Sequence, residues 1–297
     1  MAELRVWPPP LATGSRVRVV APAGPVNPER LATGMEVLTS WGLSVELGDD
    51  VLTTDDRLSY LAAADDRRAA DLTAAWTDRR VGVVWAARGG YGSQRMLDRL
   101  DWSRLRAAGP KHLVGFSDVT ALHGRLGREL GQVTVHGPGV ASVGQLRDPA
   151  TAESLQRLLL QPPVSGTLVA SGRTLVSGSA GGRLWGGNLS LLASEVGVEP
   201  PPEDRSVLVL EEVAEPGYRI DRYLTQLLRA GWLDRVRGVL VGDVGSGSPV
   251  VADRLGVLGI PVVVDAPIGH GDRNLALPLG ADVRLDAAGP TGTLTLC

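Results

Sequence analysis

Residues 111–120 read KHLVGFSDVT, a short apolar run followed by a small residue, a serine and the start of a helical pattern. Leu113 and Val114 predict a buried strand, and the spacing from Asp118 to Leu130 predicts an amphipathic helix. A serine at such a strand-to-helix turn exposes its hydroxyl beside the free N–H groups of the helix, as a nucleophile requires. The stretch therefore predicts a β-α unit with Ser117 as a candidate nucleophile.

The match to the general nucleophile motif Gly-x-Ser-x-Gly is only half complete. Gly115 stands two residues before Ser117, but Val119 stands where the second glycine would be. The alternative is that Ser117 caps the following helix with its side-chain oxygen. This segment alone leaves both interpretations open, so partners elsewhere in the chain must decide.

Strands and helices are expected to alternate through the first half of the chain. Apolar runs predict buried strands, and apolar residues at helical spacing predict the helices between them. The polar face of the helical segment 58–78, rich in Asp and Arg, is expected to be solvated. This order predicts an α/β fold with a parallel sheet, built from strands at 16–21, 43–47 and 81–87 and helices at 28–41 and 58–78.

The character of the sequence changes between residues 148 and 182, which contain a Pro-Pro pair and several Ser-Gly pairs. We therefore predict an N-terminal α/β domain at 1–147, a crossover linker at 148–182 and a C-terminal domain at 183–297. The last of these is richer in strand, with strands expected at 206–210, 236–241, 262–264, 281–285 and 291–296, and helices at 189–196 and 220–230.

Composition excludes several classes of function. A chain of 297 residues with 43% hydrophobic residues suits two domains, and a net charge of −3 offers no surface for nucleic acid. No signal peptide and no apolar run of membrane-spanning length is evident, which predicts a cytoplasmic protein with no membrane partner. The single cysteine, Cys297, excludes an internal disulfide and a multi-Cys zinc site, so we expect an oxygen nucleophile, no metal and no cofactor.

A serine nucleophile needs a base, and the chain has four histidines. His112 and His123 flank the serine turn in the strand and the helix, where structural roles are expected. His136 ends the next strand and stays a possible participant. His270 lies between two glycines in a loop after a buried strand, a freedom that a packed histidine would not need. It is the favoured base, with a capping or surface role as the alternative.

Two consecutive carboxylates, Glu211 and Glu212, follow the strand at 206–210. Their side chains point to opposite faces, so at most one can orient the histidine, and we favour Glu211. The alternative is that both are solvated residues opening a loop. For the oxyanion, the segment 88–92 (RGGYG) offers unhindered N–H groups and does not match the phosphate-binding glycine motifs.

Seven blocks in this order resemble the LD-carboxypeptidase family of serine peptidases, also called muramoyltetrapeptide carboxypeptidases, and their relatives that hydrolyse microcin C. The blocks are 87–92, 114–123, 136–138, 186–189, 210–212, 218–222 and 269–271. The resemblance implies a catalytic triad of Ser117, Glu211 and His270, with the oxyanion held by the N–H groups of Gly90 and Asp118. It also implies an N-terminal domain similar to class I glutamine amidotransferases and a strand-rich, swivelling or barrel-like β/α C-terminal domain, with the active site between them.

The resemblance further implies a hydrolase of peptidoglycan recycling. The family cleaves the amide bond between an L-centre and a terminal D-alanine in cytoplasmic murein tetrapeptides, and a homodimer is expected. Arg88 is a candidate to hold the substrate carboxylate, with Asn188 and Trp185 as further candidate contacts. The alternatives are a microcin C immunity-type hydrolase of aminoacyl nucleotides and a non-catalytic two-domain protein that binds a small molecule.

Overall fold

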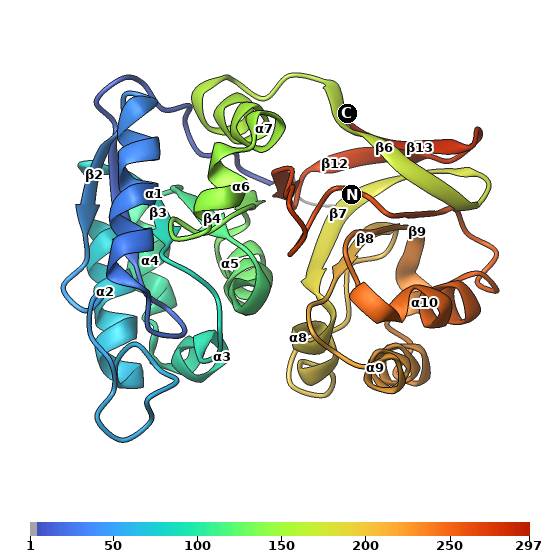
Figure 1. The fold of residues 1–297 in the computed structure, drawn as a ribbon, viewed down its shortest axis with the longest axis horizontal. Helices are drawn as coiled ribbons and strands as arrows, with labels where there is room; N and C mark the ends of the chain where they lie inside the picture. Colours follow the sequence, from blue (N-terminus) through green and yellow to red (C-terminus); the bar gives the residue numbers. More distant parts are fainter. Residues whose placement is uncertain (1–4) are drawn as a thin grey trace. The chain divides into compact units, whose positions relative to one another are not determined.

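The computed structural model describes residues 5–297, which divide into two compact units (Figure 1). Unit 1 runs from the first described residue to Pro163 and includes Ala276–Pro278, whereas unit 2 comprises Val164–Leu275 and Leu279–Cys297. The chain passes from one unit to the other within the expected crossover, between helix α7 (Pro149–Leu160) and strand β6 (Gly166–Val176). Both elements belong to their units, and a short late segment returns to unit 1.

Unit 1 is built on a six-stranded sheet in the order β11-β5-β4-β3-β1-β2. The pairs β1–β2, β1–β3, β3–β4 and β4–β5 are parallel, which confirms the α/β class expected for this half. Burial of both sheet faces explains why the inner strands β3 and β4 read as mostly apolar runs. The strands are β1 (Arg16–Val20), β2 (Ser44–Leu47), β3 (Val81–Ala86), β4 (His112–Gly115), β5 (Thr134–His136) and β11 (Leu277–Leu279).

The connections of unit 1 are mostly helical. The α-helices are α1 (Pro28–Ser40), α2 (Asp65–Thr77), α3 (Ser93–Met96), α4 (Trp102–Ala108), α5 (Thr120–Leu130), α6 (Val143–Arg147) and α7; the 3-10 turns are η1 (Leu97–Arg99) and η2 (Ser117–Val119).

Helix α2 corrects, at Arg68, the expectation that the polar face of 58–78 is solvated, whereas Asp66 and Arg67 on the same helix are exposed. Only Asp65–Thr77 is helical, and Arg68 on this helix is buried, with 2% of its surface exposed. Its guanidinium is hydrogen-bonded to the Ala63 and Gly92 carbonyls, so a charge expected in solvent lies in the interior of the unit.

Unit 2 is a closed barrel in the order β10-β6-β13-β12-β7-β8-β9, in agreement with the strand-rich second domain. The pairs β7–β8, β8–β9 and β9–β10 are parallel, whereas β6–β10, β6–β13, β12–β13 and β7–β12 are antiparallel. Besides β6, its strands are β7 (Ser179–Asn188), β8 (Ser206–Glu211), β9 (Val236–Val241), β10 (Val262–Val264), β12 (Asp282–Asp286) and β13 (Thr291–Leu296).

Three helices pack together beside the parallel strands of the barrel: α8 (Leu189–Ser194), α9 (Gly217–Arg229) and α10 (Ser248–Leu255), with α9 in contact with both others (Figure 1). The buried residues Ile220, Leu224 and Leu227 of α9 join one apolar cluster with Leu208 and Val239 of the strands. This packing fixes the strands whose carboxyl ends carry polar side chains. In the described part of the chain, no helix is both long and apolar enough to cross a membrane.

Candidate functional site

Ser117 lies at a strained turn between β4 and the helices that follow. Its φ angle is 61°, a left-handed conformation that costs a non-glycine residue roughly 1 kcal/mol or more. Neither η2 nor α5 receives a side-chain cap hydrogen bond, so the structure does not support the alternative in which Ser117 caps the helix. A strained serine that makes no cap hydrogen bond is typical of a nucleophile turn.

The glycine-rich loop after β3 lies directly against this turn. A Cβ atom added to Gly89 would stand 2.9 Å from the Ser117 Cβ atom and 3.3 Å from the Asp118 nitrogen. Gly90 has a φ of 120°, which only glycine adopts readily. Gly89 therefore lies against Ser117 and Asp118, and Gly90, a candidate oxyanion donor together with Asp118, is the next residue of the same loop.

Glu211 and His270 form a partly buried pair in unit 2. Glu211 ends strand β8 with its side chain fully buried, and its Oε2 atom lies 2.6 Å from Nδ1 of His270. A short hydrogen bond of this kind is charge-assisted when the carboxylate is ionised. It places the proton on Nδ1 and leaves Nε2 as the basic nitrogen.

The electrostatics of the pair suit a base. Burial raises the pKa of the Glu211 carboxyl, and the hydrogen bond and charge of His270 oppose that rise. For His270, burial lowers the pKa, but the hydrogen bond and charge of Glu211 outweigh it, so the pKa is raised above its usual 6.5. The carboxylate thus stabilises the imidazolium that a proton transfer would create.

Gly269 makes room for this contact, a role that the sequence analysis did not identify. Its φ is 96°, and a Cβ atom there would lie 2.7 Å from the Glu211 Cβ and 3.0 Å from Oε2. The glycine before His270 therefore permits close approach of the histidine loop to β8, besides giving the loop freedom.

Glu212 is also buried, at 3% exposure, which corrects the alternative in which both glutamates are solvated. Its carboxylate accepts hydrogen bonds from the Asn188 amide (3.0 Å), Ser190 N (2.8 Å) and Val213 N (2.9 Å). Asn188 in turn caps α8 through Leu191 N. The two glutamates thus differ: Glu211 contacts the histidine, and Glu212 ties β8 to α8.

The other residues named from the sequence are placed as follows. The Arg88 side chain is exposed and donates to the Pro25 carbonyl at 3.2 Å. Trp185 packs edge-on against Trp232, with ring centres 5.6 Å apart. His136 is fully buried in unit 1, with its ring 6.0 Å from that of Phe116.

His112 and His123 have structural partners, as expected. The Nε2 atom of His112 bonds to the Pro9 carbonyl, and His123 bridges the Thr134 hydroxyl and the Gly115 carbonyl. Burial lowers the pKa of each to about 4, which keeps both rings neutral.

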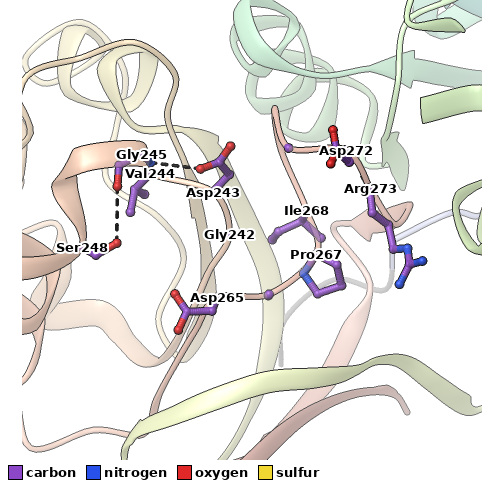
Figure 2. Close-up of a pocket in the computed structure, with 12 residues that line it drawn as sticks. Gly242, Asp243, Val244, Gly245, Ser248, Asp265, Pro267, Ile268, Asp272 and Arg273 are labelled. Carbon is purple, nitrogen blue, oxygen red and sulfur yellow. Dashed lines mark hydrogen bonds between the residues drawn. The ribbon is translucent and has the colours of Figure 1, made fainter. Parts of the chain in front are cut away.

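A cavity of about 300 Å³ opens at the carboxyl ends of β9 and β10 in unit 2 (Figure 2). Gly271, next to His270 in sequence, belongs to its wall. Figure 2 shows Asp243 and Asp265 on one side and Asp272 with Arg273 on the other. Loops that follow parallel strands are a common place for ligands. Within residues 5–297, no group of three or more His, Cys, Asp or Glu side chains is arranged to hold a metal ion.

Two family models match the chain. One, described as the LD-carboxypeptidase N-terminal domain, matches residues 17–137, and the other, the LD-carboxypeptidase C-terminal domain, matches residues 181–285. A Streptomyces coelicolor protein with carboxypeptidase in its name is 49% identical over 100% of this chain and 97% of its own length. The murein tetrapeptide carboxypeptidase of Pseudomonas aeruginosa is 32% identical over 95% of each chain.

Solved structures share the fold. The muramoyltetrapeptide carboxypeptidase of Oxalobacter formigenes is 28% identical with a TM-score of 0.81, covering 95% of this chain and 98% of that one. An MccF-like protein of Bacillus anthracis gives a TM-score of 0.87 at 24% identity, covering 98% and 99%. The similarity extends over both units.

Proposed function

Because the chain belongs to the LD-carboxypeptidase family and is a serine-type carboxypeptidase, we propose that it removes the terminal D-alanine from murein-derived tetrapeptides. The observation that carries this proposal is the hydrogen-bonded pair of Glu211 and His270, 2.6 Å apart, in a chain that also holds a strained serine turn. The serine supplies a nucleophile and the Glu211–His270 pair supplies a base, and acyl transfer requires both.

In the proposed reaction, the Ser117 hydroxyl attacks the carbonyl of the bond to D-alanine while Nε2 of His270 takes its proton. Glu211 holds the Nδ1 proton and stabilises the imidazolium. The N–H groups of Gly90 and Asp118 bind the oxyanion, each worth roughly 3 kcal/mol of barrier. His270 then protonates the leaving amine, D-alanine departs, and water hydrolyses the ester on Ser117 by the same route in reverse.

Arg88 is proposed to hold the free carboxylate of the terminal D-alanine. Its guanidinium is exposed and belongs to the segment that contains Gly89 and Gly90. A guanidinium can donate two parallel hydrogen bonds to a carboxylate. We expect Arg88→Ala to raise KM for the tetrapeptide with a smaller change in kcat, whereas Arg80→Ala, another exposed arginine of unit 1, leaves both unchanged. An unchanged KM in Arg88→Ala would contradict this role.

The charges around the unit 2 cavity favour a peptide over an aminoacyl nucleotide. Asp243 and Asp272 contribute carboxylates beside the guanidinium of Arg273, and the third carboxylate, of Asp265, is paired with Arg173 at 2.8 Å, which leaves a small excess of negative charge. Such a surface attracts ammonium groups and disfavours phosphate or sulfamate anions. We therefore place hydrolysis of aminoacyl nucleotides second, and we propose that the enzyme acts in the cytoplasm as a homodimer in the recycling of cell-wall peptides.

The test is release of free D-alanine from a murein tetrapeptide, measured by mass spectrometry beside an aminoacyl sulfamoyl adenosine. We expect D-alanine from the wild-type protein and none from Ser117→Ala or His270→Ala of unchanged thermal stability. A fluorophosphonate probe that labels the wild type but not Ser117→Ala identifies the nucleophile independently of substrate. Cleavage of the adenosine compound alone would establish the second function, and binding of both compounds without turnover would establish a non-catalytic protein.

A further inference from the structure

The glycine-rich loop that carries Gly90 is anchored at both of its ends. At its start, the Gly89 carbonyl accepts a hydrogen bond from Gly24 N at 3.3 Å. At its end, the Gly92 carbonyl accepts one from Nη1 of Arg68 at 2.9 Å. Gly90 and Tyr91 between these anchors are exposed. Because Gly90 has no side chain to pack, the position of its N–H depends on these anchors.

Arg68 makes the hydrogen bond at the Gly92 end of the loop and several others. Its side chain is completely buried on α2, and besides Gly92 it donates to the Ala63 carbonyl (2.9 Å), to the Pro22 carbonyl after β1, and to the Asp65 carboxylate. A buried guanidinium is stable only when it is hydrogen-bonded, and these four acceptors give each of its three nitrogens a partner. The same donors hold the end of the loop to the end of β1.

The Asp118 side chain makes a third hydrogen bond that holds the end of the loop, at Ser93. Its carboxylate is buried, at 2% exposure, and Oδ2 accepts a hydrogen bond from Ser93 N at 2.7 Å. Ser93 directly follows Gly92 and begins α3. Asp118 thus offers its own N–H as one candidate oxyanion donor and holds the segment that carries the other.

We propose that Arg68 and the Asp118 side chain are positioning residues that set the distance between the Gly90 and Asp118 N–H groups across the oxyanion site. This inference rests on the proposed function, because the two N–H groups matter only if Ser117 attacks a carbonyl. An oxyanion donor acts at the transition state, so a displaced loop lowers kcat more than it raises KM. A misplacement of about 1 Å costs roughly 100-fold in rate.

The experiment compares Arg68→Met and Asp118→Ala with the matched control Arg67→Met. Arg67 is the preceding residue on α2, but it pairs with Asp50 and does not touch the loop. The readouts are kcat and KM for D-alanine release and the amide hydrogen exchange of residues 88–93. We expect kcat to fall about 100-fold in both test variants with KM changed less than about threefold, faster exchange in the loop, and wild-type values in Arg67→Met.

Asp118→Asn keeps an oxygen acceptor for Ser93 N, so we expect it to lose clearly less turnover than Asp118→Ala. The comparison of Asp118→Asn with Asp118→Ala tests the positioning role even if Arg68→Met does not fold. Wild-type kcat and loop exchange in folded Asp118→Ala would overturn the inference. If the wild type itself released no D-alanine, the proposed function would fail. Independently of that result, unchanged amide exchange of residues 88–93 in the variants would show that Arg68 and Asp118 do not position the loop.

Discussion

Replacing Glu211 by glutamine removes the buried charge beside His270 and keeps the size of the side chain. The two atoms of the pair lie 2.6 Å apart. At that separation and an effective dielectric of about 20, two unit charges attract by about 6 kcal/mol, an upper figure because both groups spread their charge. Losing about 4 kcal/mol of this attraction in the transition state lowers kcat about 1,000-fold.

Two further effects of Glu211→Gln follow from the geometry. A glutamine amide can donate to Nδ1 of His270, which favours the tautomer with its proton on Nε2 and removes the base. Without the carboxylate, burial becomes the dominant influence on His270 and lowers its pKa. We therefore expect the midpoint of the pH profile of the residual activity to lie at a lower pH than in the wild type.

The assay is the initial rate of D-alanine release over a pH series, together with thermal melting. Glu212→Gln is the matched control, because Glu212 accepts three hydrogen bonds from Asn188, Ser190 and Val213 and does not contact the histidine. We expect it to lower the melting temperature more than Glu211→Gln and kcat far less. A folded Glu211→Gln variant with kcat within about threefold of the wild type would refute the role of the pair.

Three more outcomes are expected. In the wild type, kcat/KM rises with pH through a pKa above 6.5, because Glu211 favours the protonated form of His270; a midpoint below 6.5 in a pH-rate profile would contradict this. Gly269→Ala strains a positive φ and meets Glu211, so unfolding titrations should show a loss of about 3 kcal/mol together with reduced turnover, whereas wild-type stability would rule out that contact. Burial raises the pKa of Asp71 from 3.8 to about 6, so the folded state binds this proton more tightly and stability falls as pH rises between these values. Asp71→Asn should abolish that fall in melts from pH 4 to 8; an unchanged slope would show that Asp71 is not its source.

Local patterns in the sequence predicted most of the elements. The apolar runs at 236–241, 262–264 and 291–296 are strands with those bounds, and the helix expected at 28–41 is α1. These predictions succeeded because burial of one face of a helix or strand imposes a period on neighbouring residues, and burial of both faces of a strand requires a continuous apolar run. The resemblance of the seven blocks also identified the family that the comparisons show.

Side-chain partners within each unit were decided by the tertiary structure. The sequence favoured Glu211 over Glu212 by the alternation of a strand, but the contact with His270, 59 positions away, exists only in the folded barrel. Arg68 had the pattern of a surface charge, yet it binds carbonyls after β1 and in the glycine-rich loop.

By itself, therefore, the chain's sequence determined the class of fold, the family and the residue types able to perform acyl transfer. Only the folded structure determined which carboxylate meets a histidine, where the serine backbone is strained, and what anchors the loop at Gly90. The physical reason is range: hydrophobic periodicity acts between residues a few positions apart, whereas these contacts join segments that are brought together only when the sheet and the barrel close.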